Sequence, residues 1–157
     1  LGSSYQLSPG AVELLDYLVQ HSIPRTIATA SGKGNVDFFI QRLELARWFD
    51  PSQIVYDDGL LPGKPAPDIY LHAARNLGLP PERCIVVEDS ISGLQAAHAA
   101  GAGCIVAIGP AERHAALRQI EGVSAVIATL AEFPRQALTS STAKEASHAP
   151  HAVSGDL

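Results

Sequence analysis

Short, uninterrupted apolar runs alternate with segments of helical periodicity along this chain of 157 residues. Residues 84–87, for example, carry no polar side chain at alternate positions until the run ends, which is typical of a parallel strand buried on both faces. Strands that alternate with helices in this way predict an α/β fold, a three-layer, Rossmann-like arrangement around a parallel sheet. The predicted strands are 26–29, 53–56, 84–87, 104–108 and 125–127.

Helix boundaries follow from capping residues and from the spacing of apolar side chains. Ser8 is predicted to cap the first helix, with Pro9 at its first helical position, and Ser90 is predicted to cap a later one. After residue 138 the composition shifts to Ser, Thr, Ala and His without periodicity, so we expect a core over 1–138 and a disordered tail over 139–157. The other predicted helices are 36–43, 46–49, 68–77, 91–100, 112–120 and 130–138.

Charge and cysteine content argue against several classes of protein. Eleven Lys and Arg residues against 16 Asp and Glu give a net charge of −5 with no basic stripe, so we expect no nucleic-acid partner. No apolar run approaches the ~18–20 residues that cross a bilayer, so we expect no membrane partner. Cys84 and Cys104 lie outside any metal-ligand spacing and are expected to be reduced, buried thiols, which favours the cytoplasm.

Polar groups follow the first two predicted strands at the point where each strand ends. Thr29, Ala30 and Ser31 bring a hydroxyl and backbone N–H groups to the start of a helix, which suits an anion such as phosphate. Simple helix capping is the alternative. Lys64 lies among prolines that stiffen its loop, so it can present its charge to a phosphoryl oxygen. A solvated surface lysine is the alternative.

Two adjacent acids, Glu88 and Asp89, follow the third predicted strand. Such a pair is costly after a buried run unless a cation meets it, and carboxylate oxygens suit Mg²⁺. A favourable interaction with the start of the next helix is the alternative. Because ligands bind beyond the carboxyl ends of parallel strands, we expect the hydroxyl, the lysine and the acids to meet at one sheet edge. Together they would hold a phosphoryl group beside Mg²⁺.

Three stretches of the chain resemble motifs of the haloacid dehalogenase (HAD) superfamily. Residues 27–31 (IATAS), 63–68 (GKPAPD) and 87–93 (VEDSISG) are similar to its second, third and fourth motifs, and their spacing also fits. The amino-acid sequences of the third and fourth motifs are especially similar to those of the β-phosphoglucomutase-like and phosphoglycolate-phosphatase-like branch. The resemblance implies an HAD core fold over most of residues 7–138.

The resemblance also implies a role for each motif. Thr29 and the backbone N–H groups of the two residues after it would bind the transferring phosphoryl group. Lys64 would neutralise charge on the phosphoryl oxygens and on the nucleophile. Asp89 would be a Mg²⁺ ligand, and Glu88 either a ligand or a neighbour of one.

One motif of the family does not occur in this chain. The first motif, Asp-x-Asp, supplies the nucleophile after the first strand, and no such spacing exists here. Asp57 and Asp58 are adjacent and are predicted to lie in a loop, so they are a poor substitute. The resemblance therefore implies that the first strand and the cap domain are also lacking. Because the chain contains no Met and begins with Leu, we expect it to be the back part of a longer protein.

A sheet without its central strand has an energetic cost. Each orphaned buried backbone group costs ~1–3 kcal/mol, against a total stability of ~5–15 kcal/mol. We therefore expect the isolated chain to be marginally folded, or to close the gap by rearrangement, by self-association or by binding a missing N-terminal segment.

The sequence thus predicts the C-terminal core of a Mg²⁺-dependent phosphotransferase that acts on a small phosphorylated metabolite. The complete enzyme would be a phosphatase or a sugar-phosphate mutase that works through a phospho-aspartate. Since that aspartate is missing, the chain alone is expected to be inactive. The alternatives are a non-catalytic α/β binding or assembly module, and a split enzyme with the first motif on another chain.

Overall fold

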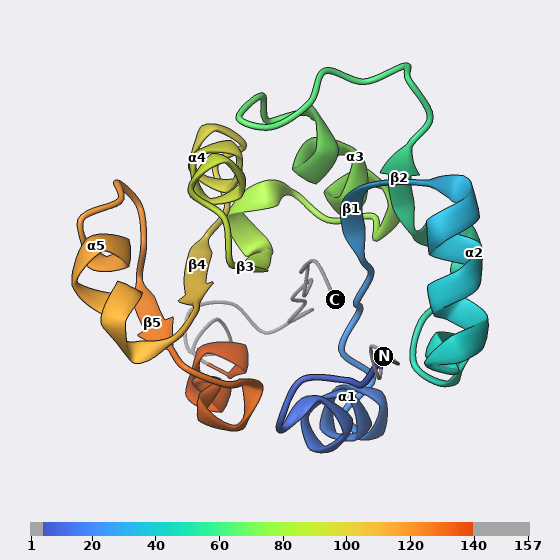
Figure 1. Cartoon of the computed structure of the whole chain (residues 1–157), viewed down its shortest axis with the longest axis horizontal. Helices are drawn as coiled ribbons and strands as arrows, with labels where there is room; N and C mark the ends of the chain where they lie inside the picture. The colour runs from blue at the N-terminus through green and yellow to red at the C-terminus, as the bar shows by residue number, and fades with distance from the viewer. Residues whose placement is uncertain (1–4, 140–157) are drawn as a thin grey trace, which may run out of the picture.

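The computed structural model describes residues 5–139, in which helices and strands alternate (Figure 1). The predicted α/β class is confirmed. The strands are β1 (Ala28–Gly32), β2 (Val55–Asp57), β3 (Ile85–Glu88), β4 (Cys104–Ile108) and β5 (Ala125–Ile127). The α-helices are α1 (Ala11–Gln20), α2 (Lys33–Arg42), α3 (Asp68–Asn76), α4 (Ile91–Ala99) and α5 (His114–Arg118). The 3₁₀ segments are η1 (Leu45–Arg47), η2 (Pro51–Gln53), η3 (Pro81–Arg83), η4 (Ala111–Arg113), η5 (Leu130–Glu132) and η6 (Arg135–Leu138).

The strands of residues 5–139 form two parallel sheets instead of one. β1 pairs with β2, with Ala28 opposite Val55, and β4 lies between β3 and β5, with Ile85 opposite Cys104. Figure 1 shows β1 and β2 on the right of the view and β3, β4 and β5 on the left. Within the described chain, no ladder joins β1 to β3. The break therefore falls between the strands that carry the hydroxyl and the acid pair, as expected for a sheet that lacks its central strand.

Helices cover both faces of the strands. One buried apolar cluster joins Leu14 and Leu18 of α1 to Val87 of β3, and the other joins Leu94 of α4 to Val86 of β3. Successive β3 side chains thus point into different clusters, which explains why the strand is apolar until its last residue. The three-layer arrangement predicted from the sequence is confirmed.

The first helix begins two residues later than predicted. Gly10 precedes it with a φ of 83°, and the backbone carbonyl of Ser8, not its side chain, accepts from the Ala11 N–H at 3.0 Å. A Cβ at Gly10 would lie 2.2 Å from the backbone nitrogen of Ala131, so only glycine fits where α1 meets η5. The prediction of Ser8 as a side-chain cap is wrong, because a tertiary contact sets this turn.

Two further boundaries differ from the prediction. β1 continues through Gly32, so the residues after Thr29 belong to the strand and not to a turn. The helix predicted over 130–138 is instead two short 3₁₀ segments separated by Pro134, whose ring and missing N–H interrupt an α-helix.

The tail predicted over 139–157 lies outside the described residues, apart from Thr139. Among the helices of residues 5–139, none combines the length and the apolar character needed to cross a membrane.

Candidate active site

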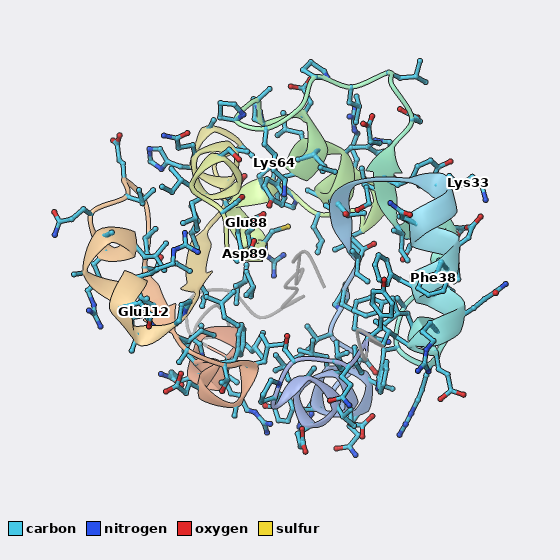
Figure 2. The ribbon with its side chains drawn as sticks, in the orientation of Figure 1. Lys33, Phe38, Lys64, Glu88, Asp89 and Glu112 are labelled. Atoms are coloured by element: carbon cyan, nitrogen blue, oxygen red, sulfur yellow. The ribbon has the colours of Figure 1, made fainter. Side chains whose placement is uncertain are left out.

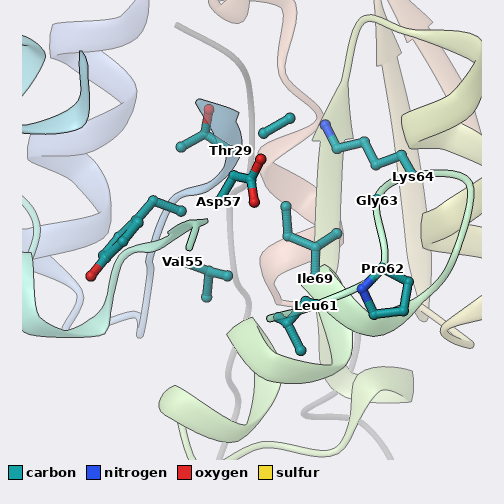
Figure 3. A pocket seen from close by; sticks show the side chains of 10 residues that line it. Thr29, Val55, Asp57, Leu61, Pro62, Gly63, Lys64 and Ile69 are labelled. Carbon is teal, nitrogen blue, oxygen red and sulfur yellow. The ribbon is translucent and has the colours of Figure 1, made fainter. Parts of the chain in front are cut away.

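Residues of β1 and β2 and the loop after β2 line one pocket of about 100 Å³ (Figure 3). Thr29 comes from β1 and Lys64 from the loop, so the two motifs meet as the sequence predicted. Asp57 also lines this pocket, because it is the last residue of β2 and not part of a loop. Its Oδ1 accepts a hydrogen bond from the backbone N–H of Gly59 at 2.9 Å.

The lysine of the third motif reaches the acid pair of the fourth. Lys64 Nζ lies 3.0 Å from Glu88 Oε2, and the two side chains are 7% and 0% exposed. Figure 2 shows Lys64, Glu88 and Asp89 together, on the far side of β1 from Lys33 on α2. A buried pair of opposite charges therefore connects the loop after β2 to the end of β3.

Protein donors engage both oxygens of the Glu88 carboxylate. Oε1 accepts from the backbone N–H of Asp89 at 3.1 Å, and from the N–H and hydroxyl of Ser90 at 3.1 and 3.0 Å. Oε2 accepts from Lys64 Nζ and from the hydroxyl of Tyr70 on α3. Since an ionised carboxylate offers about four acceptor sites, these donors satisfy its capacity.

The space for Glu88 depends on Gly93, in the first turn of α4. A Cβ at position 93 would lie 2.1 Å from Glu88 Cδ, so any larger residue would displace the carboxylate. The N–H of Gly93 donates to the Ser90 hydroxyl at 3.0 Å, which makes Ser90 the cap of α4 that the sequence predicted.

These contacts keep Glu88 ionised. Burial alone raises the pKa of its carboxyl group, but the hydrogen bond from Tyr70 and the charge of Lys64 outweigh burial and lower the pKa from 4.5 to about 2. The negative charge is therefore present across the neutral range and is paired with Lys64.

The hydroxyl side of the site is built differently. Thr29 is 8% exposed, and its Oγ1 accepts from the backbone N–H of Ser31 at 3.1 Å. Ala30 lines the pocket beside Thr29 and Lys64. Of the residues predicted to bind phosphate, three line the pocket, while Ser31 contacts one of them.

Asp89 lies at the solvent-exposed end of this arrangement. Its backbone carbonyl accepts from Arg113 Nη1 at 3.2 Å. Within residues 5–139, no cluster of three or more His, Cys, Asp or Glu side chains could hold a metal ion. Mg²⁺, however, usually binds one or two carboxylates and completes its shell with water and substrate phosphate. An acid pair next to Lys64, which lines the pocket, fits that chemistry, and Asp89 is better placed than Glu88, whose oxygens already have donors.

Tyr70, Gly93 and Arg113 belong to the site but are not predicted from the sequence. Tyr70 has the pattern of an ordinary core residue on the apolar face of a helix. Gly93 does carry a signal, because a glycine inside a predicted helix costs about 1 kcal/mol relative to alanine and often marks a close contact.

Comparisons with known proteins agree with this geometry. The family model "haloacid dehalogenase-like hydrolase" matches residues 1–101. "Protein CbbY" of Rhodobacter capsulatus is 39% identical over 100 residues, which cover 60% of this chain and 42% of that protein. Hexitol phosphatase A of Escherichia coli is 38% identical over 104 residues, covering 66% and 47%. The crystal structure of an HAD hydrolase, family IA, variant 3, from Entamoeba histolytica superposes with a TM-score of 0.78 at 42% identity, covering 86% of this chain and 60% of that one.

The fold and the site define an α/β protein with a Rossmann-like core, in which a hydroxyl and a lysine line one pocket and the lysine pairs with a buried acid. The family match is more specific: the chain belongs to the haloacid dehalogenase-like hydrolases. It is similar to a putative β-phosphoglucomutase from Thermotoga maritima, with a TM-score of 0.66 at 32% identity, covering 75% of this chain and 54% of that one. It spans about half the length of the curated relatives that it matches.

Proposed function

We propose that this chain carries the phosphoryl-binding and cation-binding part of a Mg²⁺-dependent phosphotransferase that acts on small phosphorylated metabolites. The observation that carries the proposal is the buried ion pair between Lys64 and Glu88, 3.0 Å long, beside the pocket that Thr29 lines. A phosphatase for phosphorylated carbohydrates is supported by the similarity to hexitol phosphatase A. A sugar-phosphate mutase is the other form of the same chemistry.

Each group has a distinct task in this proposal. The ammonium group of Lys64 and the hydroxyl of Thr29 bind and orient the phosphoryl oxygens, and the positive charge offsets the negative charge that develops during transfer. Asp89, with Glu88 beside it, would hold Mg²⁺, which supplies further charge neutralisation when bound.

The covalent step needs a nucleophile, which the Asp-x-Asp motif of the family would supply. In the proposed reaction an aspartate carboxylate attacks phosphorus, the bond to the substrate oxygen breaks, and water or a sugar hydroxyl later takes the phosphoryl group. No Asp-x-Asp occurs in the 157 residues. We propose that the nucleophile lies on a segment that fills the break between β1 and β3.

Phosphate binding tests the proposal directly. Calorimetry with inorganic phosphate should show binding that Mg²⁺ strengthens, and Lys64→Met should weaken it about tenfold or more, because a charge-assisted hydrogen bond is lost. Asp89→Asn should remove the Mg²⁺ effect while leaving phosphate binding without the metal. Lys33→Met is the control, since Lys33 lies on α2 and pairs with Asp37. Equal binding by wild type and Lys64→Met would contradict the proposal.

Turnover gives a second test. The chain alone should not hydrolyse p-nitrophenyl phosphate above background. Hydrolysis that Asp89→Asn abolishes would mean that a nucleophile exists within these residues, with Asp57 in the pocket as the first residue to examine.

A non-catalytic binding module is the alternative, favoured by the missing Asp-x-Asp. Phosphate binding that is insensitive to Mg²⁺ and to Asp89→Asn would support the module. For location we propose the cytoplasm, because neither Cys84 nor Cys104 forms a disulfide within the described residues.

A further inference from the structure

A tyrosine hydroxyl lies at the centre of the polar cluster without a role in the proposed reaction. Tyr70 is 4% exposed and lies on the first turn of α3, and its hydroxyl donates to Glu88 Oε2. Lys64 Nζ donates to the same oxygen at 3.0 Å and lies 5.9 Å from the centre of the Tyr70 ring. Tyr70 thus touches both members of the ion pair.

Sharing one acceptor oxygen makes the two donors interdependent. The electron density of Oε2 that the tyrosine hydroxyl attracts is not available to the ammonium group. Without the hydroxyl, Lys64 Nζ would no longer share Oε2 with Tyr70, while the three donors to Oε1 would remain. In a buried site the attraction between Oε2 and the ammonium group is strong. The ammonium group would then be held more tightly against Glu88 and would interact less with an anion bound in the pocket.

We propose that Tyr70 is a positioning residue, which through Glu88 sets how firmly the ammonium group of Lys64 is held and how much of its charge reaches a bound phosphoryl group. The inference deepens the proposed function and rests on it for the identity of the anion. Its first part, the link from Tyr70 to Lys64, concerns this chain with or without phosphate.

The phenylalanine variant isolates the hydroxyl. Tyr70→Phe keeps the ring beside Lys64 and removes only the donor to Glu88. Tyr17→Phe is the matched control, because Tyr17 lies on α1 and its ring stacks on His21 with a centroid distance of 4.0 Å, and not on Lys64 or Glu88. Thermal melts identify any general loss of stability in each variant.

Lysine NMR measures the link without any ligand. The sequence holds three lysines, Lys33, Lys64 and Lys144, so their side-chain ¹⁵Nζ signals can be resolved, and Lys64→Met assigns the relevant one. Tyr70→Phe should shift the Lys64 signal and slow exchange of its ammonium protons, while Tyr17→Phe should change neither. An unchanged Lys64 signal in folded Tyr70→Phe would overturn the proposal.

Phosphate affinity completes the test through a double-mutant cycle. Tyr70→Phe should weaken phosphate binding about threefold to tenfold, a fraction of what one charge-assisted hydrogen bond contributes. In the Lys64→Met background the same change should have no effect, because Tyr70 acts through Lys64. Equal losses in both backgrounds would contradict the proposal. A Lys64 signal that moves in a chain that does not bind phosphate would contradict the proposed function and leave the link intact.

A measurement on the wild type covers the case in which Tyr70→Phe does not fold. The Tyr70 hydroxyl proton should appear as a separate downfield signal, because it is buried and bound to a carboxylate, and it should show a nuclear Overhauser effect to the Lys64 side chain. Absence of that effect in the folded wild type would equally overturn the proposal.

Discussion

The two halves of the molecule, one built on β1 and β2 and the other on β3, β4 and β5, reach the site by different means. At the end of β3, Glu88 is fully buried and accepts hydrogen bonds from the next two residues of its own chain segment. At the end of β1, Gly32 precedes α2 and provides no side-chain cap, whereas Ser90 caps α4. Residues 88–90, the acid loop, are therefore fixed by hydrogen bonds among themselves. Residues 29–34, the hydroxyl loop, run from β1 into α2 and are held mainly by the pairing of β1 with β2.

Groups from the first half join the two across the break. Lys64 follows β2 and Tyr70 lies on α3, and both donate to Glu88 in the second half. No strand ladder joins the two sheets of residues 5–139, so this polar contact and the apolar clusters connect them. The comparison teaches that the residues proposed for chemistry also hold the halves together.

A pair of helical glycines gives the largest expected difference between the halves. Gly93→Ala in α4 should lower the free energy of unfolding by about 4 kcal/mol, since its Cβ would lie 2.1 Å from Glu88 Cδ and displace a buried charge. Gly34→Ala in α2 meets nothing within 4 Å and should be neutral or stabilise by up to about 1 kcal/mol. Urea denaturation of both variants measures this, and equal effects would mean that the acid loop is no more constrained than the hydroxyl loop.

The two lysine–carboxylate pairs should differ almost as much. Lys64→Met leaves the Glu88 charge buried without its partner and should cost about 3 kcal/mol of unfolding free energy. Lys33→Met removes an exposed pair with Asp37 within α2 and should leave stability almost unchanged. Hydrogen exchange should show increased opening of β3 in Lys64→Met alone. A mild effect in Lys64→Met would show that the apolar clusters suffice to join the halves.

Acid should weaken the second half first. Burial raises the pKa of Glu88, but Tyr70 and Lys64 lower it to about 2, below its ordinary 4.5. The resulting stabilisation is complete above pH 4.5 and is lost as the pH falls from there toward 2, about 2 kcal/mol of it by pH 3. Denaturation at pH 7 and pH 3 should show this loss in wild type and not in Glu88→Gln. Glu132→Gln, which alters an exposed carboxylate, should keep the loss, and the same loss in Glu88→Gln would assign it to another group.

The sequence predicts these halves unequally well, for physical reasons. The runs that become β3 and β4 are buried on both faces, so an uninterrupted apolar sequence is enough to predict each strand. The structure gives β4 the predicted bounds. The start of α1 is set by Gly10 against Ala131, a contact between opposite ends of the described chain that no local pattern contains. The break between the sheets is predicted only by the resemblance to a family whose central strand has no counterpart among residues 5–139.

The site shows the same division. A local signal marks Thr29, Lys64 and Glu88, because each is a polar residue that follows or ends an apolar run or its loop. The structure places Thr29 beside Lys64 and Lys64 beside Glu88. The hydroxyl of Tyr70 carries none, since a tyrosine on an apolar helix face has the same pattern whether or not its oxygen meets a carboxylate. Sequence patterns thus locate polar residues near the ends of strands. A side chain such as Tyr70, which contacts Glu88 from another element, can be identified only from the structure.

The helix caps should give the smallest difference, and they test whether the acid loop is fixed from within. Ser90→Ala removes the acceptor for the Gly93 N–H and one donor to Glu88, and should cost about 1 kcal/mol. Gly32→Ser places a cap where α2 lacks one, in an extended backbone with φ −75° and ψ 167° that serine adopts freely, and should stabilise by a few tenths of a kcal/mol. Opposite signs in thermal melts are expected. If Ser90→Ala were neutral, the backbone N–H groups would suffice to hold Oε1 of Glu88. The two loops would then differ only in how deeply their polar side chains are buried.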